Sequence, residues 1–546
     1  MEALLLIAVF LPLFGAAVLG GKRESVRQSA LVTTLLTLAL AVILVVNYPI
    51  GSDEFARQPG SWFGSLGGPI DVRLDIALDG LSLWLFGLTA LLMVTAVLVS
   101  WEAIQQQATM FYRLLLLLET GMLGVFVARD IILFYIFFEF TLIPLFFLIG
   151  IWGSEQRRYA AIKFFLFTLA GSVLTFLGLL TIVLWVYYDS SAEQMTFSIP
   201  MLTQYLADHP MDRTLQIWIF LALFAGFAIK VPLFPLHTWL PLAHTEAPTA
   251  GSVILAGVLL KIGTYGFVRF CLPMLPEATV VCMPWLLWLS VAGIIYGALV
   301  ALAQSDIKRL IAYSSVSHLG FCMLGIFALN PLGMQGGTLQ MINHGLSTGA
   351  LFALVGMLYE RYHTRRIADL AGLAKQVPVL AFFMLVMTLS SVGLPGLNGF
   401  AGEFLLLIGM FQRGWAEMSV TGGTQYLVIA VLAVSGVVLG AWYMLYLVQR
   451  VFFGPVREPK HDPSDPPVRD LCFREVMALV PLTVFVVWIG VQPRFFLDRM
   501  EPTLNQLTVE AKEALEKSLA AHPEAVRPLA ASNAPTQYPM HRPKGN

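Results

Sequence analysis

The chain has 546 residues, of which 58% are hydrophobic and 12% are charged, and its mean hydropathy is +0.77. Soluble domains carry about 25% charged residues, so the composition excludes an ordinary soluble protein and indicates a polytopic membrane protein. The net charge of -1 comes with no basic tract, which gives no reason to expect nucleic-acid binding.

The cysteines and the first apolar run bear on cofactor binding and on N-terminal processing. The four cysteines lie far apart and form no CxxC pair, which argues against an iron–sulfur cluster or a disulfide framework on this chain. The first apolar run has no cationic segment before it and no clear small-residue cleavage site. We therefore interpret it as a retained helix and not as a cleaved signal.

Fourteen apolar runs are long enough to cross a bilayer, which takes about 20 residues. They predict an all-α polytopic membrane protein with about 14 transmembrane helices. The runs cover residues 2–20, 29–48, 78–100, 111–128, 130–152, 160–187, 215–245, 249–272, 282–304, 308–329, 335–359, 378–412, 426–453 and 473–492. In the tail that follows, Glu501–Ala521 is a candidate surface helix, and the Pro- and Ala-rich remainder is expected to have little order.

Lysine and arginine are distributed unevenly between the two sets of connections. The connections after odd-numbered helices hold eighteen of them and those after even-numbered helices hold six. The positive-inside rule then predicts that both termini lie on the outer, periplasmic side of a bacterial inner membrane.

Two of the runs are interrupted near their middle. In the seventh, Lys230 is followed by Pro232 and Pro235, and in the twelfth, Pro395 and Gly396 precede Glu403. Paired interruptions at corresponding places indicate inverted repeats, here of five helices each. The predicted divisions are residues 1–110 (three helices), 111–272 (first repeat), 282–453 (second, inverted repeat), 473–492 (last helix) and 493–546 (polar tail).

Six ionisable residues lie near the middle of predicted spans, each on a different helix. They are Glu139, Lys230, Lys261, His318, His344 and Glu403. A lysine at mid-bilayer costs roughly 2.5–3.5 kcal/mol, and a proline inside a helix costs about 3 kcal/mol. Such costs at neighbouring positions point to a function. Because imidazole titrates near neutral pH, and the proton affinity of a lysine depends on nearby carboxylates, we expect the row to relay protons.

Each of these residues also has a structural interpretation. Glu139 can be a carboxyl group kept protonated in an apolar site, or one member of a packing pair. A lysine near a helix end reaches the interface with its long side chain, although Lys230 and Lys261 are both centrally placed. His318 and His344 can be satisfied core residues. Haem ligation is disfavoured, because neither helix carries a second, suitably spaced histidine, and no metal site is predicted.

Four further residues are candidates for a supporting role. Tyr135 lies one turn before Glu139 and can share its site. His237, His244 and Glu246 lie nearer the cytoplasmic end of the seventh helix and its loop, where they either feed protons into the row or simply face water.

Several stretches resemble one known family. They are FPLHTWLPLAHTEAPTAGSVILAGVLLKIGTYG, FYIFFEFTLIPLFFLIGIWG, SSVSHLGF and GLPGLNGFAGEF. Together they resemble the M-type (chain-4-type) membrane subunits of respiratory complex I, the proton-pumping NADH:quinone oxidoreductase, in the antiporter-like family. The resemblance covers essentially helices 3–13. The AHTEAPTAGS segment, a glutamate at Glu403 and the lack of a long lateral helix favour the M-type chain over the L-type and N-type chains.

The resemblance implies a proton-translocating subunit that is driven by electron transfer elsewhere in the complex. It implies that Glu139 and Lys230 form a coupling ion pair, that Lys261 is the central relay, and that His318 and His344 are intermediate relays. It also implies that Glu403 is the exit-side or neighbour-facing group. It implies no cofactor on this chain, with FMN, iron–sulfur clusters and quinone in partner subunits, and L-type and N-type chains on either side. The alternatives are a subunit of a sodium/proton antiporter and a structural spacer. Quinone binding is a third, weaker alternative.

Overall fold

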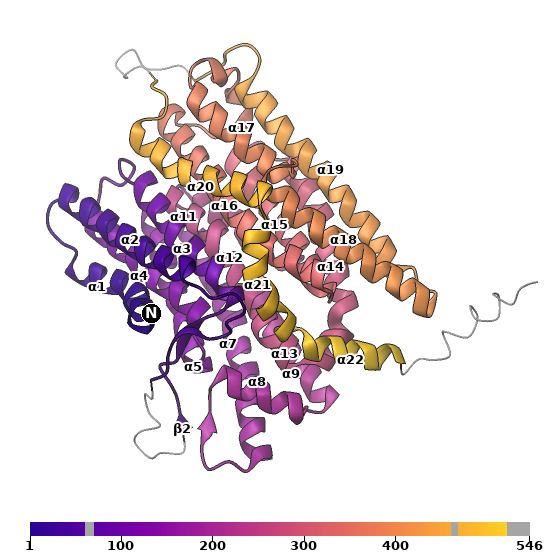
Figure 1. Cartoon of the computed structure of the whole chain (residues 1–546). Helices are drawn as coiled ribbons and strands as arrows, with labels where there is room; N and C mark the ends of the chain where they lie inside the picture. The colour runs from indigo at the N-terminus through magenta and orange to yellow at the C-terminus, as the bar shows by residue number, and fades with distance from the viewer. Residues whose placement is uncertain (61–69, 460–467, 521–546) are drawn as a thin grey trace, which may run out of the picture.

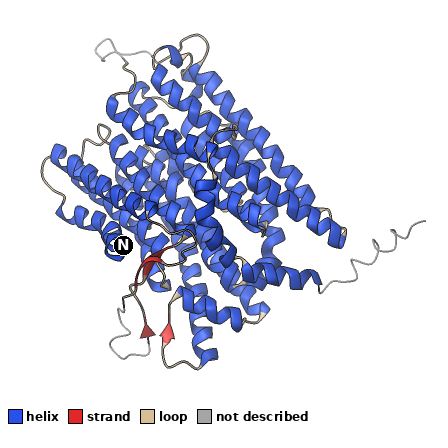
Figure 2. Cartoon of the chain, viewed as in Figure 1, coloured by secondary structure: helices blue, strands red, loops and turns tan. Residues whose placement is uncertain are grey.

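The structure is a computed structural model, and it describes residues 1–60, 70–459 and 468–520. Helices account for most of this part of the chain (Figure 2). Twelve of them are long and apolar enough to cross a membrane, and two shorter apolar helices, α1 (Glu2–Val18) and α17 (Pro378–Val392), occupy the places of the two remaining predicted spans. The expected all-α fold with fourteen spans is therefore confirmed.

The helices pack side by side into one bundle, with the first half of the chain on the left of Figure 1 and the second half on the right. The uninterrupted spans other than α1 are α2 (Arg23–Val46), α3 (Gly80–Val99), α4 (Ala108–Val127), α7 (Arg157–Ser190), α14 (Pro276–Leu302), α15 (Ile307–Phe327), α16 (Pro331–Tyr362), α19 (Gln425–Phe452) and α20 (Phe473–Val491). Two of these, α15 and α16, are buried along almost their whole length, which places them at the centre of the bundle.

Four spans are irregular, and all four carry residues of the predicted row. The fifth span is α5 (Ile131–Phe140) and α6 (Leu142–Trp152), joined at Thr141. The seventh is α9 (Arg213–Lys230) and α10 (Leu240–Glu246), and the twelfth is α17 followed by α18 (Asn398–Thr421). The eighth contains two π-helical turns, and its segments are α11 (Thr249–Ile254), η2 (Leu255–Leu259), α12 (Leu260–Gly266), η3 (Phe267–Cys271) and α13 (Leu272–Met274). The interruptions at Pro232 and Pro235, and at Pro395 and Gly396, lie where the sequence predicts them.

The loops between spans hold structure that the sequence reasoning did not predict. Strand β1 (Phe55–Gln58) pairs antiparallel with β3 (Ile76–Leu78), and β2 (Ile70–Asp71) pairs parallel with β4 (Met195–Thr196). The amphipathic helix α8 (Ile199–Asp208) follows β4. All of these elements gather at the end of the bundle where α3 begins, which we call the N-terminal face.

The C-terminal segment crosses this N-terminal face as a strap, which we define as α21 (Arg494–Leu507) and α22 (Val509–Ala520) (Figure 1). Helix α21 packs on α3 and α16, and α22 packs on α14. The predicted start of a surface helix at Glu501 is wrong, because the amphipathic pattern begins at Arg494 and buries Phe496 and Met500. The predicted low order beyond Ala521 concerns residues outside the described part of the chain.

Candidate functional site

Five of the six predicted row residues are deeply buried. Lys230, Lys261, His318, His344 and Glu403 are each at most 5% exposed. Glu139 is half-buried on α5. The structure therefore places all six side chains on different spans within the helix bundle.

The four residues from Lys261 to Glu403 form a close sequence of contacts across four spans. The Lys261 ammonium lies 2.7 Å from Nδ1 of His344. The ring of His344 lies 5.9 Å, centre to centre, from the ring of His318. Nδ1 of His318 is 3.3 Å from Oε1 of Glu403. The contacts at the two ends of this sequence are at or near the distance over which side chains transfer a proton, directly or through one water molecule. The two imidazoles between them are in ring contact only.

The end of this sequence at Glu403 lies in a polar pocket of the bundle. Nε2 of Gln340 donates to Oε1 of Glu403 at 3.0 Å, and Nδ2 of Asn343 donates to the carbonyl oxygen of Asn398 at 2.7 Å. On the other side of His318, its Nε2 lies 3.5 Å from the hydroxyl of Tyr443. These amides and the hydroxyl hold the carboxylate and the imidazole in place, as the groups around a functional site must do.

Lys261 owes its position to the irregular geometry of the eighth span. The π-helical turn η2 ends two residues before it, and the lysine ammonium donates a hydrogen bond to the backbone carbonyl of Ala256. Isolated π-helical turns are frequent at functional sites. Because Lys261 is completely buried, this carbonyl and His344 supply the polar partners that a buried ammonium needs.

Lys230 is the last residue of α9, at the point where the seventh span breaks. The indole of Trp239 donates to the carbonyl of Ile229 at 3.0 Å, and the amide of Leu233 donates to the carbonyl of Ala228 at 2.9 Å. These bonds satisfy carbonyl groups that the interrupted helix leaves without its own donors. The break is thus an ordered, hydrogen-bonded part of the fold and not a frayed helix end.

The predicted ion pair between Glu139 and Lys230 is not formed in this structure. No Lys230 nitrogen lies within 4 Å of the Glu139 carboxylate, and Oε1 of Glu139 is buried without a hydrogen-bond partner among the described residues. Instead, the Lys230 ammonium lies 4.7 Å from the centre of the Phe138 ring. Tyr135 interacts with Glu139, as its position one turn earlier predicts, and its ring stacks on Phe176.

The other supporting residues have different surroundings. His237 lies in the break and packs against the rings of Phe234 and Tyr296. His244 is fully buried, its ring stacks on Phe352 at 4.4 Å, and neither ring nitrogen has a hydrogen-bond partner among the described residues.

Glu246 has a structural contact that the sequence did not reveal. Its carboxylate accepts a hydrogen bond from the amide of Gln156 at 2.9 Å, at the start of α7. Of the two alternatives left open for Glu246, facing water does not hold, because Glu246 is 8% exposed.

A cavity of about 470 Å³ opens at the end of the bundle opposite the strap, beside Ala247, Pro248 and Thr249, which follow His244 in the chain. Its walls include Lys308, whose ammonium donates to the carbonyl of Ala247 at 2.6 Å, and Glu360. Lys308 and Lys261 both act electrostatically on His244. The sequence reasoning treated Lys308 only as a loop charge, yet it is 6% exposed and belongs to this region.

The sequence reasoning missed two further groups of buried charges. Glu119, in the middle of α4, is fully buried, and neither of its carboxylate oxygens has a partner among the described residues. Asp79 bridges Arg129 and Arg269 at the N-terminal face. Glu119 was detectable as an acid inside an apolar run. The Asp79 group was not, because its members are far apart in the sequence.

Within the described residues, no group of three or more His, Cys, Asp or Glu side chains is placed to hold a metal ion. The predicted lack of a metal or other cofactor on this chain stays a prediction.

Comparisons with known proteins place this site in a family. Residues 128–429 match the model of the NADH:quinone oxidoreductase/Mrp antiporter transmembrane family. The chain is 39% identical to NADH-quinone oxidoreductase subunit M of Rhodobacter capsulatus, over 93% of this chain and 96% of that protein. It is 38% identical to NADH-ubiquinone oxidoreductase chain 4 of Chondrus crispus, over 91% and 96% respectively.

A solved structure agrees with these sequence relatives. A chain of respiratory complex I from Thermus thermophilus with bound NADH superimposes with a TM-score of 0.79 and 33% identity, over 92% of this chain and 99% of that chain. The matched region contains the whole row from Glu139 to Glu403. The chain therefore belongs to the NADH:quinone oxidoreductase/Mrp antiporter transmembrane family.

Proposed function

We propose that this chain is a proton-translocating membrane subunit of an NADH:quinone oxidoreductase. The observation that carries the proposal is the buried sequence of contacts from Lys261 through His344 and His318 to Glu403. Each member can gain or lose a proton, and each is within a short step of the next. A purely structural spacer has no need for four titratable groups in contact at the centre of a bundle, since every buried charge costs free energy.

In this mechanism, Glu139 and Lys230 act as the coupling pair. The structure has the pair open, and a closed state would hold the proton on Lys230 more tightly. Opening then favours release of that proton toward Lys261, and the proton continues through His344 and His318 to Glu403. Moving one charge across the membrane takes about 2.3 kcal/mol per 100 mV, which a change in a buried ion pair can supply.

The finer parts of the proposal follow the family resemblance. The chain itself carries no redox centre, and FMN, iron–sulfur clusters and quinone belong to partner subunits. L-type and N-type chains lie on either side of it, and the complex sits in a bacterial inner membrane with both termini outside. Residues 111–272 and 282–453 form the two inverted repeats. The interrupted spans at Lys230 and at Pro395, each the fourth of its five helices, support this division.

The test uses the complete complex, purified and reconstituted into vesicles, with Lys230 replaced. Lys230→Arg keeps the positive charge but cannot release a proton, and Lys230→Ala removes both charge and proton. We expect both variants to assemble and to lose NADH-driven proton pumping, while the exposed Lys22→Ala control pumps as the parent does. Pumping at the parental ratio of protons to electrons in the Lys230→Arg complex would refute the proposal.

The rival functions have outcomes of their own. Sodium-dependent counterflow by complex that lacks the NADH-oxidising part would favour a sodium/proton antiporter. Unchanged pumping in a fully assembled Glu139→Gln complex would favour a structural spacer.

A further inference from the structure

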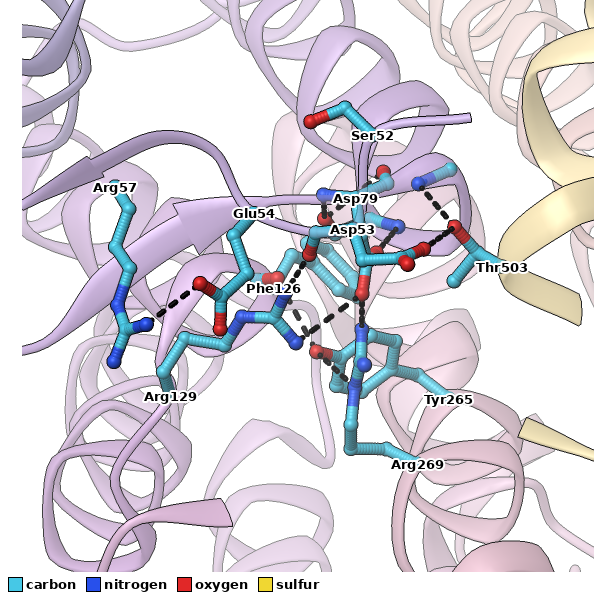
Figure 3. Close-up of polar contacts among 12 residues, drawn as sticks. Ser52, Asp53, Glu54, Arg57, Asp79, Phe126, Arg129, Tyr265, Arg269 and Thr503 are labelled. Carbon is cyan, nitrogen blue, oxygen red and sulfur yellow. Dashed lines mark hydrogen bonds and ion pairs between the residues drawn. The ribbon is translucent and has the colours of Figure 1, made fainter. Parts of the chain in front are cut away.

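A buried charge cluster lies at the N-terminal face, apart from the row that the proposed function uses. Figure 3 shows its core, in which the Asp79 carboxylate lies between the guanidinium groups of Arg129 and Arg269. Oδ2 of Asp79 is 2.5 Å from Nη2 of Arg269 and 3.4 Å from Nη1 of Arg129. All three residues are at most 7% exposed, and together they carry a net charge of about +1 at neutral pH.

The sequence around Asp79 explains why it is held so firmly. Asp79 is the N-cap of α3, where its Oδ1 accepts a hydrogen bond from the amide of Ser82 at 2.9 Å. Burial by itself would raise the pKa of this carboxyl group, but the charges of Arg269 and Arg129 outweigh burial and lower the pKa below its usual value. Asp79 thus acts as a counter-ion to the two guanidinium groups.

One member of the cluster, Arg269, lies on the same span as Lys261, between Lys261 and the N-terminal face. Tyr265 follows Lys261 by four residues, and Arg269 follows by eight, which places all three on one side of this span. Nε of Arg269 donates to the Tyr265 hydroxyl at 3.1 Å, and this hydroxyl donates to the carbonyl of Phe126 at 3.2 Å. Between Lys261 and the N-terminal face, a proton would therefore meet Tyr265 and Arg269, whose hydrogen bonds are already formed.

Beyond the cluster lies a cavity of about 370 Å³. Its lining includes Asp53, Glu54, Arg129 and Arg269, and also Thr503 of the strap. Thr503 accepts a hydrogen bond from the amide of Gly80, next to Asp79, and donates to Asp53 at 3.4 Å (Figure 3). The two guanidinium groups thus form the wall between this cavity and the interior of the bundle.

The opposite side of Lys261 is built differently. There, His244 is buried with both ring nitrogens free of partners among the described residues, and the 470 Å³ cavity beside Lys308 lies close by. An unpartnered imidazole can accept and pass on a proton, whereas an arginine in a protein does not release one. His244 can therefore pass a proton on at one end of the eighth span, whereas Arg269 cannot do so at the other end.

We propose that Arg269 and Arg129, joined by the Asp79 carboxylate, form a barrier to protons between Lys261 and the N-terminal face. This inference rests on the proposed function, since it assigns a direction to the same relay. A fixed, buried positive charge repels hydronium and other cations, as arginine does in selective pores. With the N-terminal face closed to protons, the contact of Lys261 within the relay is His344. The proton on Lys261 therefore passes through His344 toward Glu403, and protons from the N-terminal face do not leak back to Lys261.

The test measures passive proton leak in the complete complex, reconstituted into vesicles and given a pH gradient without NADH. Arg269→Met removes the charge but keeps an apolar side chain of similar length, and it leaves Asp79 paired with Arg129. We expect the gradient to decay several-fold faster than with the parent complex, and NADH-driven pumping to yield fewer protons per electron. Arg269→Lys keeps a positive charge, so the pH gradient should decay at close to the parental rate.

The control is Arg413→Met. Arg413 is as buried as Arg129 and pairs with Glu417 at 3.4 Å, but it lies on α18 and not above Lys261. This variant should show the parental decay, so a leak confined to Arg269 and Arg129 variants separates the barrier from general loosening of the bundle. If Arg269→Met does not assemble, Arg129→Met decides in its place.

Two outcomes would overturn the barrier. Decay at the parental rate in both Arg269→Met and Arg129→Met would show that the cluster holds back no protons. Loss of pumping without any leak would make the cluster an outlet instead. The leak is measured without NADH turnover, so the first outcome is independent of the proposed function, which Lys230→Arg tests through pumping. Loss of pumping overturns the barrier only where the Lys230→Arg complex has upheld the relay.

Discussion

The Lys261 ammonium and the Nδ1 atom of His344 lie 2.7 Å apart, although the two residues are 83 positions apart in the chain. Nε2, the other ring nitrogen of His344, has no hydrogen-bond partner among the described residues. His344 thus contacts the lysine through one ring nitrogen, and an imidazole can exchange a proton through the other. The contact therefore couples the first half of the row to the second.

Replacing His344 by glutamine should interrupt this coupling. Glutamine keeps a polar side chain of comparable length but cannot be protonated near neutral pH, so we expect NADH-driven pumping to fall by about tenfold or more. The measurement is proton uptake by vesicles that contain the assembled complex. His209→Gln, at an exposed position after α8, is the matched control. Parental pumping in His344→Gln would remove His344 from the relay.

Gly263 sets the distance between α12 and the break in the seventh span. A Cβ atom at this position would lie 2.6 Å from the carbonyl oxygen of Phe227 and 2.9 Å from the amide nitrogen of Val231. Both neighbours are backbone atoms, so Gly263→Ala must push the helices apart, at a cost of about 1–3 kcal/mol. We expect a lower thermal midpoint and reduced pumping, because Lys230 moves with Val231.

Gly251 is the matched control for this substitution. It lies on the same span, and a Cβ atom there would meet only ordinary contacts, the nearest at 3.4 Å from Cβ of Ala247. Gly251→Ala should leave stability and pumping unchanged. Equal effects of the two substitutions would contradict the account of Gly263.

Glu119 is a buried carboxylic acid that contributes no contact to the relay. Replacing it with leucine removes an unsatisfied polar group, which should stabilise the protein by about 1–3 kcal/mol, seen as a higher thermal midpoint in detergent. Pumping should stay at the parental level. Glu119→Gln, which leaves the site polar, should bring no such gain. A loss of pumping in Glu119→Leu would instead place Glu119 in the proton path.

Asp130 predicts a pH dependence of stability. It is the N-cap of α5 and lies between two spans, where burial raises its pKa from 3.8 to about 6 despite three backbone hydrogen bonds that lower it. The folded protein therefore binds this proton more tightly than the unfolded chain. The contribution of Asp130 to stability should thus be greatest below pH 4 and should fall by about 3 kcal/mol as the pH rises to about 6.

The corresponding variant is Asp130→Asn, which keeps an N-cap side chain but does not titrate. Thermal midpoints measured between pH 4 and pH 7 should depend less steeply on pH in this variant than in the parent. Asp212→Asn, at the exposed N-cap of α9, should leave the slope unchanged. A parental slope in Asp130→Asn would show that another group carries the pH dependence.

The sequence predicts the spans and the membership of the row well, because both depend on local properties. An apolar run of sufficient length must cross the membrane as a helix, since no water is present to satisfy its backbone. A charge such as Lys261 inside such a run must be buried with a partner. The breaks at Pro232 and Pro395 follow from the missing amide hydrogen of proline.

The contacts between distant segments could not be predicted in the same way. The Asp79 cluster joins residues whose positions differ by 50 and 190, and each of them alone reads as a loop charge or a helix-end charge. Glu246 looked like a loop residue because its partner, the amide of Gln156, belongs to another helix. The open state of Glu139 and Lys230 reflects one arrangement of two helices, which a pattern along one chain does not encode.

The strap ties the N-terminal face to a segment 423 positions later in the chain. The amide of Gly80 is satisfied by Thr503, and the indole of Trp84 donates to the carbonyl of Phe496 at 3.2 Å. During synthesis, α3 enters the membrane long before either partner exists. A nascent chain that stops short of α21 leaves the amide of Gly80 and the indole of Trp84 without their acceptors. Synthesis of α21 is thus the step that supplies both partners on this face of the protein.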